Sequence, residues 1–393
     1  MKARFNRKHC PFITYCKGFV DGHIVKSARL NDQGVIQSAY VTSWMKSYDE
    51  WVSEQIKGLD NALKSVRQEA TDLIVEEKVI RRKLLELMAK PDIPEEASID
   101  EKREAKRRGA EKEALAVSND KGSFSTEMLV LLPKGASDVP VVIGENFSGN
   151  AAALENSEWP FETILDRGFG VATMGYTDWA ADDTAAYRDG VLRLFDDESL
   201  SAFSAWAFGI SRGIDYLETL PEVDRNRIAS VGHSRLARVS LWAGACDERI
   251  ALVTGSCGGG LLRSPVMGRI TTDGTSNHWY TPAYLTYENR DNELPVDMHT
   301  LFALAAGRRL FVCIGENDLA SDPVSMYDAL QFAKVVWRDG YGREVIPDGS
   351  YYDVPFDTPI VSDSVGVIVH SGGHKFADSD WDAILSYMET YVK

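Results

Sequence analysis

The chain has 393 residues, of which 44% are hydrophobic, and a formal net charge of −16 at pH 7. This length allows one large domain and a smaller one, and the apolar content is sufficient for a substantial core. The acidic charge argues against nucleic acid and anionic membrane surfaces as partners. Because no run of about 18 uninterrupted apolar residues occurs, no membrane-spanning helix is expected.

Residues 1–111 differ in character from the rest of the chain. From about Ala39 to Lys90 the sequence has a helical period, and its apolar residues alternate steps of three and four as in a coiled coil. These residues are Ile56, Leu59, Leu63, Val66, Ala70 and Leu73. We predict an N-terminal helical segment over residues 1–111. It would serve either as an arm for homo-oligomerisation or docking to a larger assembly, or as helices folded against the remainder.

The first residues are basic, but the apolar core of a signal peptide does not follow them. The sequence therefore leaves the location open between the cytoplasm, a larger particle, and export with a signal that has been removed. Five cysteines are present, and their spacing does not match a metal site. We expect neither a metal nor a cofactor.

A nucleophile motif lies in the second half of the chain. An apolar, strand-like run at residues 227–231 is followed by Gly232, by Ser234 and by a helix-like stretch at residues 237–245. A strand, a sharp turn and a helix are the elements that present a nucleophilic serine above the sheet in α/β-hydrolases. The second glycine of the usual pattern is absent. We predict Ser234 as the nucleophile of an α/β-hydrolase, a three-layer α/β sandwich over residues 112–393.

The base and the acid of a serine triad follow the serine in the order acid, then histidine, in this fold. A buried, strand-like run at residues 310–314 precedes Asp318, and a last strand-like run at residues 365–369 precedes His374. We predict His374 as the general base and Asp318 as the carboxylate that orients it. His370 is expected to point to the opposite face of its strand, because side chains alternate along a strand.

The identity of the triad acid stays open at this point. Asp322 and Glu316 lie in the same loop as Asp318, and position in the loop does little to separate them. An aspartate at the end of a strand also often serves only as a helix cap or a turn residue. Both Asp322 and Glu316 therefore remain alternatives.

Several separate stretches are informative together: residues 144–150, 204–209, 212–217, 231–235, 278–280, 293–299, 318–323 and 372–374. Through them, the chain from roughly Lys112 to its end resembles the glucuronoyl esterases and their bacterial acetylxylan-esterase-like relatives, carbohydrate esterase family 15. The resemblance implies hydrolysis of an ester between the carboxylate of a glucuronic acid on a xylan-like polysaccharide and an alcohol, typically of lignin.

The resemblance also implies roles for two arginines. Arg235 follows the serine, where the family's arginine helps to hold the oxyanion, and Arg238 stands where a lysine of the family contacts the sugar. A guanidinium beside a developing alkoxide adds charge-assisted hydrogen bonds. The alternative for Arg235 is a pair with a nearby carboxylate that only braces the turn.

Aromatic residues fit a carbohydrate substrate, because sugar rings stack well on flat aromatic faces. Trp279, beside His278, is the pocket candidate, and we predict that both residues bind substrate together with Arg238. Trp206 and Trp242 lie within helix-like patterns and are predicted to pack in the core.

Two departures from the family pattern keep other functions open, and one of them is Gly307-Arg308-Arg309, where relatives usually carry a proline-containing turn. The loop at residues 254–260, where fungal members carry the acid, contains no carboxylate here. A carbohydrate (xylan) acetyl esterase would use the same triad. A non-catalytic structural or interaction protein on a hydrolase scaffold is the third hypothesis, which Cys257 and Ala237 favour. On that hypothesis Ser234→Ala would change nothing except stability.

Overall fold

The structure is a computed structural model of the chain. It describes residues 15–20, 23–30, 36–44, 110–154, 158–264, 276–318 and 320–392. The chain divides into two compact units, residues 1–82 and residues 83–393.

The first unit contains a three-stranded antiparallel sheet. Its strands, in spatial order, are β1 (Tyr15–Val20), β2 (His23–Leu30) and β3 (Ile36–Trp44). Because β3 is rich in β-branched and aromatic residues, it favours an extended backbone. The predicted helical period is therefore wrong over residues 39–44, and residues 1–111 are not helical throughout. The rest of the predicted helix, with its coiled-coil positions, lies outside the described residues.

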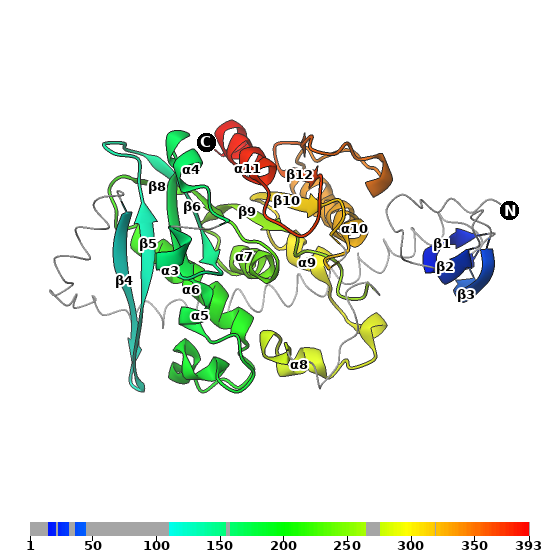
Figure 1. Cartoon of the computed structure of the whole chain (residues 1–393), viewed down its shortest axis with the longest axis horizontal. Helices are drawn as coiled ribbons and strands as arrows, with labels where there is room; N and C mark the ends of the chain where they lie inside the picture. Colours follow the sequence, from blue (N-terminus) through cyan, green and yellow to red (C-terminus); the bar gives the residue numbers. More distant parts are fainter. Residues whose placement is uncertain are drawn as a thin grey trace. The chain divides into compact units, whose positions relative to one another are not determined.

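The second unit is centred on a nine-stranded mixed sheet in the described part of the chain. Its strands are β4 (Ala110–Asn119), β5 (Gly122–Leu131), β6 (Val139–Asn146), β7 (Gly170–Gly175), β8 (Val223–Ser230), β9 (Ile250–Ser256), β10 (Arg309–Gly315), β11 (Ile360–Val361) and β12 (Val365–His370). Their order is β11-β12-β10-β9-β8-β6-β7-β5-β4. In Figure 1, β4 and β12 lie toward opposite sides of this sheet. The strands from β12 to β7 pair in parallel, whereas β4, β5 and β11 pair antiparallel. The sheet begins at Ala110, slightly before the predicted start at residue 112.

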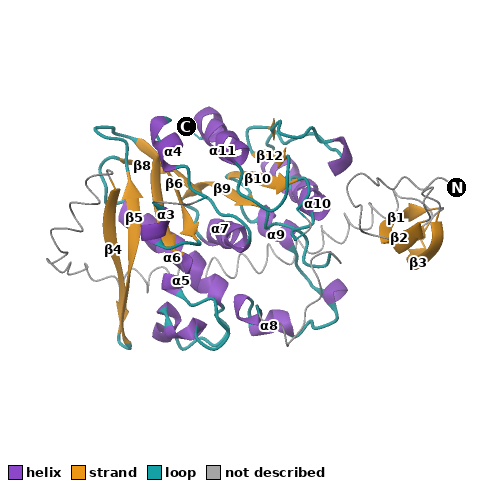
Figure 2. Cartoon of the chain, viewed as in Figure 1, coloured by secondary structure: helices purple, strands orange, loops and turns teal. Residues whose placement is uncertain are grey.

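Helices cover both faces of this sheet (Figure 2). One face carries α6 (Ala202–Leu217), α7 (Arg235–Cys246), α9 (Met298–Ala303) and α10 (Pro323–Ala333), and the other carries α4 (Phe161–Asp166) and α11 (Asp378–Tyr391). In β6, Val141 and Ile143 pack in the first core and Val142 packs in the second, because side chains alternate along a strand. These layers confirm the predicted three-layer α/β sandwich.

Shorter elements fill the connections between strands. They are α3 (Asn150–Ala153), α5 (Tyr176–Trp179), η2 (Tyr187–Asp189), η3 (Val191–Leu194), η4 (Asn277–Trp279), α8 (Pro282–Leu285), η5 (Asp291–Glu293), η6 (Val336–Gly340) and η7 (Tyr351–Asp353). Among the described residues, no helix has both the length and the apolar content needed to cross a bilayer. Trp206 is fully buried, as predicted, but Trp242 is 43% exposed, which contradicts its predicted place in the core.

The carboxyl ends of the parallel strands position the predicted site residues. Ser234 follows β8, Asp318 follows β10 and His374 follows β12, and these strands run in the same direction. Parallel strands present their carboxyl ends at one edge of the sheet, where α/β folds place their ligands. Three residues far apart in the sequence can therefore meet at this edge.

Candidate active site

Ser234 lies on a sharp turn between β8 and α7. Its backbone has φ 58° and ψ −126°, a conformation that costs free energy for a residue with a side chain. The Ser234 backbone N–H donates to the carbonyl oxygen of Ser256 over 2.8 Å, which fixes the turn against the end of β9. The strained turn predicted for a nucleophilic serine is therefore present.

The absent second glycine of the motif is compensated by the facing loop. A Cβ atom on Gly232 would lie 2.1 Å from the carbonyl oxygen of Leu236, so this first glycine is required. A Cβ atom on Gly258 would lie 2.1 Å from the carbonyl oxygen of Ser234 and 2.6 Å from the Cβ atom of Ala237. Because Gly258 leaves this space open, the turn tolerates Leu236 and Ala237.

The structure brings Ser234, His374 and Asp318 together. His374 Nε2 lies 2.7 Å from Ser234 Oγ, and His374 Nδ1 lies 2.8 Å from Asp318 Oδ2. The Asp318 side chain is 1% exposed, whereas the His374 side chain is 34% exposed. The imidazole thus bridges a buried carboxylate and a hydroxyl that solvent can approach.

Asp318 is kept ionised by the donors around it. Its Oδ1 accepts from the backbone N–H groups of Ala320 and Ser321, each over 3.1 Å. Burial alone would raise the pKa of this carboxyl, but hydrogen bonds from His374, Ser321 and Cys257, together with the charge of His374, lower it below its usual value. Asp318 is therefore an anion that can orient a protonated imidazole.

The alternative acids are engaged elsewhere. Asp322 is the N-cap of α10, where its Oδ1 accepts from the Ser325 backbone N–H over 3.2 Å and its Oδ2 accepts from the Ser264 hydroxyl. The Glu316 backbone N–H donates to the carbonyl oxygen of His370, and its carboxylate accepts from Asn317 over 3.4 Å. Of the three candidates, Asp318 is the one hydrogen-bonded to His374.

His370 forms a second, separate pair. Its side chain is fully buried, with Nδ1 2.8 Å from Asp380 Oδ1 and Nε2 3.2 Å from the carbonyl oxygen of Gly373. Burial lowers the pKa of His370, but the hydrogen bond and the charge of Asp380 outweigh it and raise that pKa. As predicted, His370 does not face Ser234.

Arg235 is held by a carboxylate that the sequence analysis missed. Asp182 Oδ2 accepts from an Arg235 guanidinium nitrogen and, over 2.9 Å, from the Tyr176 hydroxyl. Its Oδ1 lies 2.8 Å from His278 Nε2 and accepts from Trp279 Nε1 over 2.6 Å. Burial raises the pKa of Asp182, but the donors on it and the charge of Arg235 bring it below its usual value. Asp182 thus joins three segments of the site.

This arrangement gives the predicted substrate-binding residues internal partners. His278 is buried, and its other ring nitrogen lies 3.2 Å from the Thr184 hydroxyl. The Trp279 ring lies 4.7 Å from the Arg235 guanidinium and 5.6 Å from the Phe203 ring. Both residues therefore brace Arg235. The alternative considered for Arg235, a carboxylate pair at the turn, is present.

Arg238 lies one turn further along α7. Its Nε donates to the carbonyl oxygen of Gly258 over 2.9 Å, and NH1 donates to the Tyr280 hydroxyl over 2.5 Å. Tyr280 stacks on Tyr284 with ring centroids 4.3 Å apart. Arg238, a predicted site residue, is thus bonded to one tyrosine that in turn stacks on a second.

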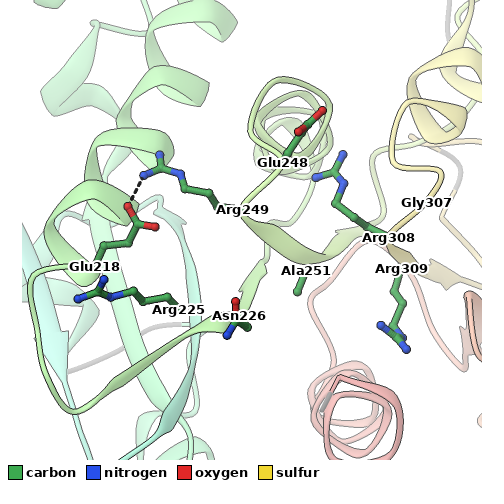
Figure 3. A pocket seen from close by; sticks show the side chains of 9 residues that line it. All are labelled: Glu218, Arg225, Asn226, Glu248, Arg249, Ala251, Gly307, Arg308 and Arg309. Carbon is green, nitrogen blue, oxygen red and sulfur yellow. Dashed lines mark hydrogen bonds and ion pairs between the residues drawn. The ribbon is translucent and has the colours of Figure 1, made fainter. Parts of the chain in front are cut away.

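A hollow lies at the edge of the sheet opposite Ser234, around the starts of β9 and β10 (Figure 3). Arg249 donates to the carboxylates of Asp215 and Glu218, each over 2.8 Å. Arg308 donates to the carbonyl oxygens of Asp247 and Ile250 over 2.9 and 3.1 Å. These guanidinium groups are used within the protein, and β9, which is seven residues long, separates them from Ser234 by about 20 Å. The hollow is not part of the candidate site.

A largely parallel sheet between two helical layers, with the serine, histidine and aspartate at its carboxyl edge, is the arrangement of the α/β-hydrolase class. The family model described as "Glucuronyl esterase, fungi" matches residues 115–340, which is more than half of the chain. The chain belongs to the glucuronyl esterase family and is a carboxylic ester hydrolase.

Individual relatives agree with the family. A carbohydrate esterase from an unknown prokaryotic organism is 28% identical over 315 residues, which cover 68% of this chain and 71% of the relative. The 4-O-methyl-glucuronoyl methylesterase of Podospora anserina is 29% identical over 272 residues, 61% of this chain and 53% of the relative. The chain thus spans about half the length of this fungal protein. The structure of a glucuronoyl esterase from Solibacter usitatus has a TM-score of 0.65 at 28% identity, covering 72% of this chain and 82% of that chain.

Proposed function

We propose that the protein is a serine esterase for carbohydrate esters, which cleaves the ester of a glucuronic acid carboxylate through Ser234, His374 and Asp318. The observation that carries the proposal is the continuous hydrogen-bonded arrangement from the Ser234 hydroxyl through His374 to Asp318, at 2.7 and 2.8 Å. Membership of the glucuronyl esterase family supports the carbohydrate ester as the substrate class.

The geometry supports a two-step reaction. Ser234 Oγ attacks the ester carbonyl while His374 Nε2 takes its proton, and His374 then returns that proton to the departing alcohol. Asp318 stabilises the imidazolium that forms between these transfers. Water then releases the glucuronate from Ser234 by the same route in reverse, so the protein needs no group beyond its own side chains.

Arg235 and the start of α7 would stabilise the oxyanion. Arg235 is the first residue of α7, so its backbone N–H lies at the helix N-terminus, the position that supplies an oxyanion donor in this fold. Arg235 Nε is buried and has no hydrogen-bond acceptor in the described part of the chain. An unsatisfied buried donor is costly, and a substrate oxygen would satisfy it. The hydrogen bond from Arg235 to Asp182 uses a different guanidinium nitrogen, NH1, so Nε stays available.

The first experiment compares two substrates on two proteins. Hydrolysis of a benzyl ester of glucuronic acid and of an aryl acetate is measured for the wild type and for Ser234→Ala. We expect the wild type to cleave the glucuronate ester and Ser234→Ala to lose at least about 10³-fold in kcat/KM. Cleavage of the acetate alone would point to the acetyl esterase instead. If the wild type cleaves neither ester, the non-catalytic hypothesis takes the place of the proposal.

A further inference from the structure

Three side chains of metal-ligand types converge beside Ser234. Cys257, Asp318 and His374 each offer one ligand atom, and these atoms all lie within 4.8 Å of one another. The thiol comes from the loop after β9, the carboxylate from the loop after β10 and the imidazole from the loop after β12. Because the three residues are far apart in the sequence, their spacing predicted no metal site.

The fold holds Cys257 firmly in this place. The residue is fully buried and has a left-handed backbone with φ 53°, which costs free energy for a residue with a side chain. Its N–H donates to the carbonyl oxygen of Cys313 over 2.9 Å, and its carbonyl oxygen accepts from the Ser321 hydroxyl over 2.5 Å. These bonds hold the Cys257 Sγ atom within 4.8 Å of a carboxylate oxygen of Asp318, and the thiol itself donates to the carbonyl oxygen of Lys375 over 3.6 Å. The partly exposed His374 gives an ion a route from solvent.

We propose that Cys257, Asp318 and His374 bind a zinc ion, and that this binding inhibits the esterase. Thiolate, imidazole and carboxylate are the protein ligands of zinc, at about 2.0–2.3 Å. Two ligand atoms on one tetrahedral zinc ion lie about 3.3–3.6 Å apart, so the three side chains, whose ligand atoms lie within 4.8 Å of one another, need to move by about 1 Å at most. The inhibition rests on the proposed function, whereas the binding of the ion does not.

Binding exchanges one proton for the ion. The Cys257 thiol releases its proton to solvent and its sulfur bonds to the ion, while Asp318 contributes one carboxylate oxygen. His374 binds through Nδ1, whose proton passes through solvent to Nε2. With Nε2 protonated, His374 has no lone pair to accept the proton of Ser234. Zinc thus removes the base and engages its orienting carboxylate without displacing the serine.

The chemistry of the ligands also predicts which ions act. The sulfur of Cys257 must lose its proton before it binds an ion, because the thiolate is the metal ligand. An ion must bind thiolate strongly to displace this proton. Mg²⁺ and Ca²⁺ prefer oxygen ligands, and we expect neither of them to inhibit.

A zinc titration of esterase activity tests the inhibition. Wild type, Cys257→Ala and Cys246→Ala are stripped with EDTA, returned to chelator-free buffer and titrated with ZnCl₂. Cys246 is an exposed cysteine at the far end of α7 and serves as the matched control. Wild type and Cys246→Ala should be inhibited at the same zinc concentration and recover with EDTA. Cys257→Ala, normalised to its own zinc-free activity, should need at least about tenfold more zinc, because one of three ligands is lost.

Equal zinc sensitivity of Cys257→Ala and the wild type overturns the site, as does inhibition by Mg²⁺ at the same concentration. Circular dichroism checks that Cys257→Ala is folded, and Cys257→Ser replaces it if it is not. Serine keeps the size of the side chain but is a poor zinc ligand, so the expected loss of sensitivity is the same.

Cobalt binding separates the metal site from catalysis. Co²⁺ bound to a thiolate gives a charge-transfer absorption band, which we expect in the wild type and in Ser234→Ala but not in Cys257→Ala. Because Ser234→Ala lacks the proposed nucleophile, a band in this variant reports binding alone. Absence of the band in the wild type overturns the metal site even if the esterase is active. A band in a wild type that cleaves no ester supports the site and overturns the proposed function instead.

Discussion

Two histidines, one at the end of β12 and one in the loop that follows it, each pair with a buried aspartate, and the two pairs behave differently. His374 and His370 have Nδ1 2.8 Å from a carboxylate oxygen of Asp318 and Asp380, respectively. The Nε2 atom of His374 faces the Ser234 hydroxyl, whereas that of His370 faces a backbone carbonyl oxygen. A carbonyl has no proton to give, so His370 can only donate there. The partner of Nε2 therefore decides which histidine can act as a base.

The buried pair supports the loop that carries the exposed one. His370 is bonded to the carbonyl oxygen of Gly373, the residue before His374. Asp380 Oδ2 accepts from the backbone N–H of Ala377 over 3.2 Å and from the Ser256 hydroxyl over 3.1 Å. The loop between β12 and α11 is thus fixed on both sides of His374. The His370–Asp380 pair therefore positions His374 by fixing the backbone of its loop.

Replacing the exposed histidine should separate chemistry from stability most clearly. We expect His374→Gln to lower kcat/KM for the glucuronate ester by about 10⁵-fold or more, because no other group takes the serine proton. Its thermal unfolding should stay close to that of the wild type, since the side chain is 34% exposed. Steady-state kinetics and calorimetry measure the two effects. Retained activity would show that His374 is not the base.

The two aspartates of the β10 loop offer a matched test of the acid. Asp318→Asn should lower kcat/KM by about 10⁴-fold, because an amide neither fixes the tautomer of His374 nor stabilises its charge. Asp322→Asn removes the negative charge at the N-cap of α10 but keeps an acceptor there, so it should cost about 1 kcal/mol or less of stability, with little change in activity. If Asp322→Asn loses as much activity as Asp318→Asn, the assignment of the acid is wrong.

The sequence predicted the serine, histidine and aspartate because each follows a recognisable buried strand. Chain order and strand ends are sufficient for that part, since parallel strands share one edge. Asp182 was missed because it belongs to an irregular connection, and its partners lie at residues 176, 235, 278 and 279. Only the fold brings these together. Cys257 and Asp318 are also far apart in the sequence, so their proximity could not be predicted from it.

The N-terminal prediction went wrong for a different physical reason. The helical period predicted from Ala39 rests on apolar residues further along the chain, whereas Ile36–Trp44 contains the β-branched and aromatic residues typical of a strand. Trp242 was placed in the core because its segment is helical, but a helix also has an exposed face. The local sequence pattern indicates whether a segment is a helix or a strand, whereas the burial of a residue depends on which face of that element packs against the core.

Breaking the buried pair should affect stability more than chemistry. Asp380→Asn leaves His370 buried without its counter-charge, and we expect a loss of about 3–5 kcal/mol in the free energy of unfolding. Asp382 lies on the same helix with its side chain 78% exposed and pairs with Arg167, so Asp382→Asn should cost about 1 kcal/mol or less. Urea unfolding measures both. Equal losses would contradict the structural role of Asp380.

His233, next to Ser234, has no hydrogen-bonded carboxylate in the part of the chain that the structure describes, and it should respond to pH. His233 is 5% exposed, and burial, followed by the charge of His374, lowers its pKa from 6.5 to about 4. Between these values the unfolded chain binds a proton that the folded protein does not, so stability falls as the pH falls. From pH 7 to pH 5 this group should cost about 2 kcal/mol.

The measurement is urea unfolding of the wild type and His233→Gln at both pH values. Other titrating groups contribute to both proteins and largely cancel in the difference. The wild type should therefore lose about 2 kcal/mol more than the variant between pH 7 and pH 5. An equal loss in both proteins would show that His233 is accessible to protons in the folded state.

The smallest effect is expected at Asp182, which holds Arg235 and also has a histidine partner, His278, that is buried like His370. Asp182→Asn removes the negative charge and one acceptor oxygen, so the guanidinium loses its anchor. We expect about a tenfold fall in kcat with little change in KM, because Arg235 is proposed to act on the transition state.

A double-mutant cycle distinguishes this anchor from a general packing role. If Asp182 acts through Arg235, the loss in Asp182→Asn should largely disappear when Arg235 is already alanine, because the anchored group is gone. Additive losses would instead show that Asp182 supports the site through Tyr176 or His278. Tyr176→Phe, which removes one donor but leaves the charge pair intact, should then reproduce part of the effect. If Asp182 acts through Arg235 instead, Tyr176→Phe should leave kcat nearly unchanged.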